Sequence, residues 1–111
     1  MVEFNYGGKR YSLGFNRKSA AAIERAGFVS SEITDKPNIM IPLLVVGAFQ
    51  MNHKRMRDDE IDKVFDNIAD KDGFVSALLK EYQKTYETLL GKPEDDGDTE
   101  DSENFIQWTE I

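Results

Sequence analysis

The chain changes composition abruptly at Pro93. The ten residues 94–103 include no apolar side chain, so they have nothing to bury in a core, and their carboxylates repel one another. Residues 92–111 carry eight acids and one base, a net charge of −7, whereas residues 1–91 carry 13 acids and 13 bases and are neutral. This division predicts a folded domain over residues 1–91, followed by a flexible, disordered acidic tail over residues 92–111.

Two short alternating segments at the start of the chain predict a β-hairpin. Apolar and polar residues alternate over residues 2–6 and again over residues 10–15, and Gly7-Gly8 lies between them. Glycine reaches the positive φ values of a tight turn without steric cost. A lone hairpin is only marginally stable in water, so its apolar side must pack on another element. That side consists of Phe4, Tyr11, Leu13 and Phe15.

A short helix and a buried helix are predicted to follow the hairpin. The first covers residues 17–26, with Asn16 as its N-cap and Gly27 as its C-terminal stop. The second covers about residues 38–52 and is apolar nearly all round, which predicts the central, most buried helix.

Two prolines set the start of that second helix. Pro37 and Pro42 flank the beginning of its apolar run. Proline is tolerated in the first turn of a helix but not deeper, so we expect the helix to begin at about residue 38.

Two amphipathic helices are predicted in the second half of the domain. Three carboxylates at residues 58–60 favour a helix N-terminus, and apolar residues then recur at i, i+3, i+4 and i+7. Asp72 can cap a fourth helix, which Gly91 and Pro93 end. The whole pattern predicts a mainly α (α+β) fold, an N-terminal β-hairpin packed on about four helices. The recurring apolar residues are Ile61, Val64, Phe65 and Ile68.

The fourth helix and the tail are predicted to bind a partner. The apolar stripe of the helix is wider than one small core needs, so part of it would be left for another protein or a second copy of the chain. The tail ends in apolar residues behind an acidic linker, which is typical of short motifs that order on binding. The alternative for the tail is that its aromatic residues pack on the domain itself. The predicted partner-binding residues are Phe74, Leu78, Tyr82, Tyr86, Phe105 and Trp108.

No pattern of catalytic or metal-binding residues is found. The chain has no cysteine, and its one histidine, His53, has neither a paired ligand nor a carboxylate beside it and is predicted to be exposed. Residues 70–73 are similar to part of a calcium loop, but the first and last ligand places fall on Ile68 and Leu79, which cannot bind calcium. We therefore predict a protein that is not an enzyme and has no cofactor, metal or small-molecule substrate.

Basic residues form three small groups, at residues 9–10, 17–18 and 54–57. They could converge on a cationic patch, but a tail of net charge −7 would compete with nucleic acid for it, so nucleic acid is not a predicted partner. One interpretation is ordinary solvated charge, and another is a tail that folds back on the patch until a partner displaces it. The apolar run at residues 39–49 is too short to cross a bilayer and no signal peptide is visible, so no membrane association is predicted.

The order of these segments resembles that of a family of small phage and prophage proteins, the tail assembly chaperones of long-tailed (siphovirus-type) phages. The resemblance lies in residues 15–28, 41–49, 61–65 and 78–90, followed by the acidic tail with its tryptophan. It therefore spans nearly the whole chain.

The resemblance implies a protein that binds the tape-measure protein in the bacterial host cytoplasm. Such chaperones keep the tape-measure protein soluble until tail-tube subunits polymerise around it, and they are absent from the mature virion. The tail-tube protein and a second copy of the chain are further expected partners. In that family a longer form often arises by ribosomal frameshifting, and no catalytic residues are known to carry over.

Two further hypotheses use other features of the sequence. An acidic regulatory or inhibitory phage protein would bind a host or phage protein through its tail, and that binding would weaken steeply with salt. A chaperone that binds by apolar burial would show weak salt dependence. A structural component of the tail or capsid connector is the third hypothesis, but only the hairpin favours it, since such subunits tend to be rich in strands.

Overall fold

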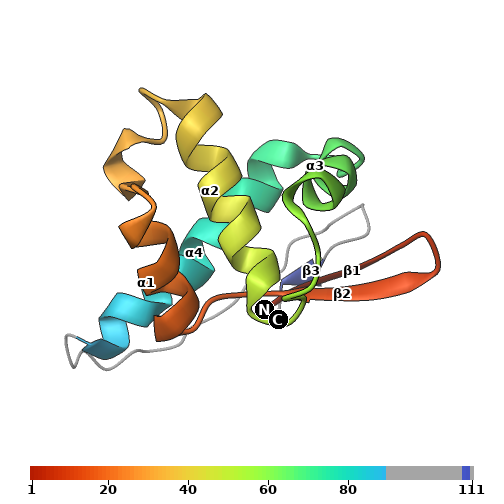
Figure 1. The fold of residues 1–111 in the computed structure, drawn as a ribbon, viewed down its shortest axis with the longest axis horizontal. Helices are drawn as coiled ribbons and strands as arrows, with labels where there is room; N and C mark the ends of the chain where they lie inside the picture. The colour runs from red at the N-terminus through yellow and green to blue at the C-terminus, as the bar shows by residue number, and fades with distance from the viewer. Residues whose placement is uncertain (90–108, 111) are drawn as a thin grey trace.

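The predicted hairpin and all four predicted helices are present in the computed structural model, which describes residues 1–89 and 109–110 (Figure 1). The predicted fold class, mainly helical with an N-terminal hairpin, is confirmed. The tail over residues 92–111 is predicted to be disordered, but all of its residues except 109–110 lie outside the described part of the chain. In chain order the elements are β1 (Val2–Tyr6), β2 (Lys9–Leu13), α1 (Arg17–Arg25), η1 (Ser30–Glu32, a 3₁₀ turn), α2 (Pro37–Gln50), α3 (Asp58–Asp66), α4 (Lys71–Leu89) and β3 (Thr109–Glu110).

Gly7 and Gly8 make the tight turn of the hairpin. Their φ angles are +59° and +76°, and two successive positive φ values are what a two-residue type I′ turn needs. β1 and β2 then pair antiparallel over all five residues of each strand. β3 pairs antiparallel with the other edge of β1, with Thr109 opposite Glu3. The sheet order is therefore β2-β1-β3, and the end of the segment predicted as tail belongs to the sheet.

The buried side of the hairpin packs on α2 and α4 through aromatic rings. The ring of Phe4 stacks on that of Tyr11 with centroids 5.1 Å apart. It also meets Phe49 of α2 and Phe74 of α4 edge-on, at 6.4 and 6.0 Å. Edge-on and offset pairs at these distances are the favourable aromatic arrangements. The helices thus provide the apolar partner surface that the hairpin requires.

α2 is the central helix, as predicted, because it contacts α1, α3, α4 and β2. It begins at Pro37, one residue before the predicted start, and Pro42 lies in its second turn, where proline is less well tolerated. Pro42 cannot donate a hydrogen bond to the carbonyl of Asn38, but both residues are exposed, so water can satisfy that carbonyl. The core residues of α2 are Met40, Leu44, Val45, Gly47, Ala48 and Phe49.

Of the predicted helix caps, Asn16 is confirmed, Gly27 lies one residue beyond the C-cap Ala26, and Asp72 is wrong. The side chain of Asn16 accepts a backbone N–H of the first turn of α1, and Gly27 follows that helix with a φ of +109°. α4 is capped by Asp70 rather than Asp72, because Asp70 Oδ1 accepts the N–H of Gly73 at 3.2 Å. Asp72 lies inside the helix, in its first turn, where its negative charge still favours the helix dipole.

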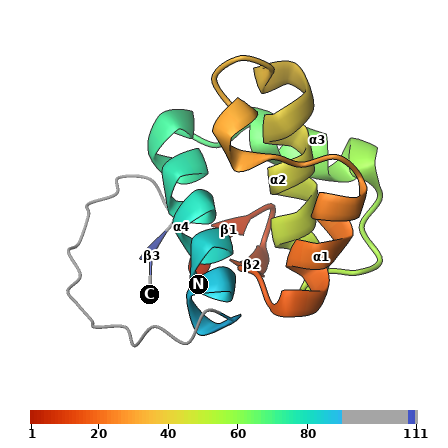
Figure 2. The ribbon, with the colours of Figure 1, turned by 90° about the vertical axis from the view of Figure 1, so that its left-hand side faces the viewer.

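The helices α1, α2 and α4 contact one another in pairs, and both ribbon views show them close together (Figures 1 and 2). α3 packs against α2 beyond the turn formed by residues 51–57. None of the helices in the described part of the chain has the length and apolar character needed to cross a membrane.

Candidate functional site

The structure places three of the predicted partner-binding residues inside the core. Phe74 and Leu78 are fully buried and Tyr82 is only 4% exposed. They are covered because the hairpin, α1 and α2 all pack on α4. The prediction that these side chains are open to a partner is therefore wrong for this fold.

Tyr82 and Tyr86 link α4 to its neighbours. The hydroxyl of Tyr82 donates a hydrogen bond to Glu24 Oε2 at 2.6 Å, which ties α4 to α1. Burial, followed by this hydrogen bond, raises the pKa of Tyr82 well above its usual value, so the phenol stays protonated and donating. Tyr86 is half-buried, with its ring 5.6 Å from that of Tyr82. The role of Tyr82 is therefore structural.

Phe105 and Trp108, the two predicted anchors in the tail, lie outside the described residues. Both the binding-motif hypothesis and its alternative, packing on the domain, stay predictions.

A groove of about 660 Å³ lies where the N-terminal ends of α2 and α4 meet η1 and the end of α3. Side chains from four segments make its apolar lining, and Lys71 and Asp72 place one charge of each sign beside them. Ile39, on the same end of α2, is 57% exposed. We call this surface the apolar groove, and its apolar residues are Ile33, Pro37, Ile41, Pro42, Phe65 and Val75.

Sequence reasoning missed the apolar groove because each of its residues has an ordinary local explanation. Phe65 belongs to a regular amphipathic pattern and Ile41 to a run that is apolar all round, so neither stands out. Only Ile33 could have indicated the groove, because it is a large apolar residue among the polar residues that precede Pro37. The groove becomes visible when the ends of separate helices are brought together.

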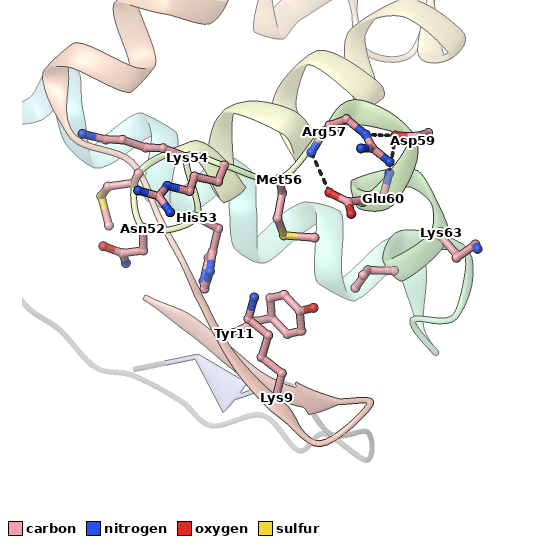
Figure 3. Close-up of a pocket in the computed structure, with 13 residues that line it drawn as sticks. Lys9, Tyr11, Asn52, His53, Lys54, Met56, Arg57, Asp59, Glu60 and Lys63 are labelled. Atoms are coloured by element: carbon pink, nitrogen blue, oxygen red, sulfur yellow. Dashed lines mark hydrogen bonds and ion pairs between the residues drawn. The ribbon is translucent and has the colours of Figure 1, made fainter.

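A second hollow, of about 1030 Å³, lies between β2, the turn 51–57 and the start of α3 (Figure 3). Five cationic side chains line it, together with the carboxylates of Asp59 and Glu60, so its lining has a net charge of +3 on a chain of −7. We call it the cationic pocket. Its cations are Lys9, Lys54, Arg55, Arg57 and Lys63, and its less polar lining includes Tyr11, His53, Met56 and Val64.

The cationic pocket confirms part of the predicted basic patch. Lys9 and the group at residues 54–57 do converge, and Lys63 of α3 joins them. The group at residues 17–18 does not line the pocket, and Arg10 instead forms an ion pair with Glu3 across the hairpin. Lys63 could not be assigned from sequence, because its place depends on how α3 turns back from α2.

The charges of the pocket are only partly neutralised within the fold. Arg57 Nε lies 3.3 Å from Asp59 Oδ1, and Glu60 Oε1 accepts the backbone N–H of Arg57 at 2.9 Å, which caps α3. Both carboxylates are therefore engaged close to Arg57. Within residues 1–89 and 109–110, Lys54, Arg55 and Lys63 form no ion pair.

His53 is half-buried and structural, although the sequence analysis predicted an exposed residue. Its Nε2 accepts the N–H of Ser12 at 3.1 Å, so the proton of the neutral ring is on Nδ1. Asn52 Nδ2 donates to the carbonyl of Ser12 at 3.2 Å. The ring packs on Tyr11 and Phe49, with centroids 5.2 and 6.2 Å away. His53 and Asn52 together satisfy the N–H and the carbonyl of Ser12, which protects this part of the edge of β2 from pairing with another strand.

Comparison with known proteins gives one match. Residues 1–109 match the family described as Domain of unknown function (DUF5055). The chain belongs to the DUF5055 family. No curated protein and no solved structure matches it. The DUF5055 match takes in both surfaces described above and extends to the first residue of β3.

In this DUF5055 chain the described residues offer no metal site. Nowhere in residues 1–89 and 109–110 do three or more histidine, cysteine or acidic side chains come together in a way that could hold a metal ion. The arrangement supports binding chemistry of two kinds: apolar burial in one groove, and attraction of anions in one pocket.

The half-buried ring of His53 predicts a loss of stability in mild acid. Burial, and then the nearby charge of Lys9, lower the pKa of His53 below its ordinary value. Between about pH 7 and pH 5 the unfolded DUF5055 chain therefore binds a proton at His53 more readily than the folded one, so the free energy of unfolding falls as the pH falls. Urea unfolding at several pH values in this range measures the loss.

The matched variant for this measurement is His53→Gln. Glutamine keeps an acceptor for the Ser12 N–H but does not titrate, and His53 is the only histidine of the chain. The pH dependence between about pH 7 and pH 5 should flatten in this variant. An unchanged slope would mean that the titration of His53 does not cause the loss of stability in this pH range.

Proposed function

We propose that this DUF5055 protein is a tail assembly chaperone of long-tailed phages. In this proposal it is a non-enzymatic protein of the bacterial host cytoplasm, which binds the tape-measure protein until tail-tube subunits polymerise around it. The observation that carries the proposal is the apolar groove, because it is an open apolar surface on a fold whose other large aromatic and aliphatic side chains are mostly buried.

The shape and lining of the groove suit an amphipathic helix. Side chains at i, i+3 and i+4 form a ridge on a helix, and such ridges bind in apolar grooves between other helices. The branched side chains of Ile33, Ile41 and Val75 and the ring of Phe65 line this groove, and its volume of about 660 Å³ can take several aliphatic side chains. Lys71 and Asp72 could pair with charges that flank an apolar stripe.

The second line of support is the resemblance of the sequence to known tail assembly chaperones. A tape-measure protein is long and helical, with apolar stripes that must be shielded before the tail tube encloses them. A chaperone for it needs an accessible apolar surface on a body that is otherwise well solvated. Residues 1–91 have balanced charge, and residues 92–111 add a net charge of −7 that favours solubility of the complex.

Co-expression with the tape-measure protein of the same phage tests the proposal. Val75→Glu places a carboxylate in the groove, and the soluble fraction of the tape-measure protein should fall because binding weakens by roughly tenfold or more. Leu89→Glu is the matched control on α4. Leu89 is 62% exposed and outside the groove, so this variant should keep the tape-measure protein soluble. A thermal melt of each variant alone shows that the fold is intact.

Two results would contradict the proposal. If the tape-measure protein stays equally soluble with either variant, the groove is not its binding surface. If the binding of any partner weakens steeply with salt and depends on the acids of residues 94–103, the regulatory hypothesis replaces the chaperone. Binding by the groove should change little with salt because apolar burial is not screened.

A further inference from the structure

The cationic pocket has no role in the proposed function and needs a different ligand from the apolar groove. Lys54 and Arg55 of the turn 51–57 and Lys63 of α3 line the same hollow, with Lys54 and Lys63 at opposite ends of it (Figure 3). None of the three has an ion-pair partner in the part of the chain that the structure describes. Lys9 adds a fourth charge, with its Nζ 5.3 Å from the centre of the Tyr11 ring. Bringing like charges together is unfavourable unless an anion offsets them.

The lining restricts what kind of anion can bind. A hollow of about 1030 Å³, with cations contributed by three segments, is wide for a single small anion and suits an extended chain with several negative groups. The carboxylates of Asp59 and Glu60 and the overall charge of −7 disfavour nucleic acid, whose binding proteins are usually basic. An extended acidic polypeptide carries several negative groups and is not a nucleic acid, so it meets both conditions.

The chain itself contains such a polypeptide. Residues 94–103 hold seven carboxylates and no base, separated only by glycine, threonine and serine. We infer that the cationic pocket is an interaction surface for this acidic segment of the same chain, whose carboxylates bind Lys54, Arg55 and Lys63.

The sheet brings the acidic segment close enough to reach the pocket. Thr109 of β3 lies opposite Glu3 of β1, and Glu3 lies opposite Ser12 of β2, whose N–H binds His53 in the wall of the pocket. Neighbouring strands are about 4.8 Å apart, so Thr109 is about 10 Å from that point. The five residues 104–108 between the acidic segment and β3 can span up to about 17 Å.

Attachment at both ends favours this segment over any free acidic peptide. α4 ends at Leu89 and β3 begins at Thr109, so the segment is held near the pocket at an effective concentration in the millimolar range. A contact built from exposed charges should weaken as salt is added. The inference does not rest on the proposed function, because it involves neither the apolar groove nor the tape-measure protein.

The test uses the full chain and a synthetic peptide of residues 93–104. In the receptor all seven acids of residues 94–103 are replaced by the corresponding amides, which keeps the length and β3 while removing the internal competitor. Calorimetry at low salt measures peptide binding to this amide variant and to the unaltered chain. The unaltered chain should bind the peptide more weakly than the amide variant does, by roughly tenfold or more, since its own acidic segment occupies the pocket.

Two charge-matched triple variants of the amide receptor locate the contact. Replacing Lys54, Arg55 and Lys63 by glutamine should weaken peptide binding by roughly tenfold or more. Replacing Arg17, Lys18 and Arg25 of α1 by glutamine should change it by less than about twofold, because these exposed residues lie outside the pocket.

Four outcomes would overturn the inference. Equal peptide binding by the unaltered chain and the amide variant would mean that the segment does not occupy the pocket. Equal losses in the two triple variants would mean a diffuse attraction with no site. A mass that rises with concentration for the unaltered chain, but not for the amide variant, would assign the segment to the pocket of a second copy. Tighter binding of a single-stranded oligonucleotide than of the peptide would assign the pocket to nucleic acid.

Discussion

Replacing Phe74 by alanine is expected to lower the free energy of unfolding by about 3–5 kcal/mol. The side chain is fully buried, and its ring meets Phe4 at 6.0 Å and Phe65 at 6.1 Å. The cavity left by the ring would therefore lie between the hairpin, α3 and α4. A domain has only about 5–15 kcal/mol of stability in total. A large fraction of the Phe74→Ala molecules should therefore be unfolded at moderate temperature. Urea unfolding followed by circular dichroism measures the change.

Leu89→Ala is the control for this prediction, because Leu89 is on the same helix and 62% exposed. This substitution should change the free energy of unfolding by no more than about 0.5 kcal/mol. The comparison also decides between the two roles considered for Phe74. A Phe74→Ala protein that kept its stability but lost a partner would support the partner-binding role predicted from sequence, against the buried position in the structure.

Local sequence patterns predict most of the fold. Gly7-Gly8 determines the hairpin turn because few residues tolerate two positive φ values, and Asn16 and Gly27 mark both ends of α1 through interactions within a few residues. These features depend on neighbours along the chain, so a single sequence contains them. The Asp70 cap was missed because its φ of +54° is unusual for a residue that begins a helix.

The candidate site was less predictable because it depends on which faces are covered. The apolar stripe of α4 looks too wide for one core, but α4 packs on the hairpin, α1 and α2, and so uses Phe74, Leu78 and Tyr82 internally. The surplus apolar surface is elsewhere, at helix ends that meet only in three dimensions. The charge pattern predicted more of the cationic pocket than the apolar pattern predicted of the groove. Lys9 and residues 54–57 were both identified from sequence as possible parts of one patch, and both line the pocket.

Gly47 is the position where the packing of α1 on α2 leaves least room. A Cβ built there would overlap the Cγ2 of Ile23 and would lie 3.0 Å from Cε1 of Phe15. Gly47→Val is therefore expected to lower the free energy of unfolding by about 3 kcal/mol, although valine has a better helix propensity than glycine. Gln50→Val is the control on the same helix, at an exposed position, and should cost less than about 1 kcal/mol.

A double variant shows whether the close approach is the cause. Ile23→Ala alone should cost about 2–4 kcal/mol, because Ile23 is only 5% exposed. Combined with Gly47→Val, it removes the overlapping methyl group and opens space that the valine can fill. The double variant should then lose clearly less stability than the two single variants added together, with a coupling of about 1 kcal/mol or more. Simple additivity would mean that the two helices can move apart to admit a side chain, and that Gly47 does not set their distance.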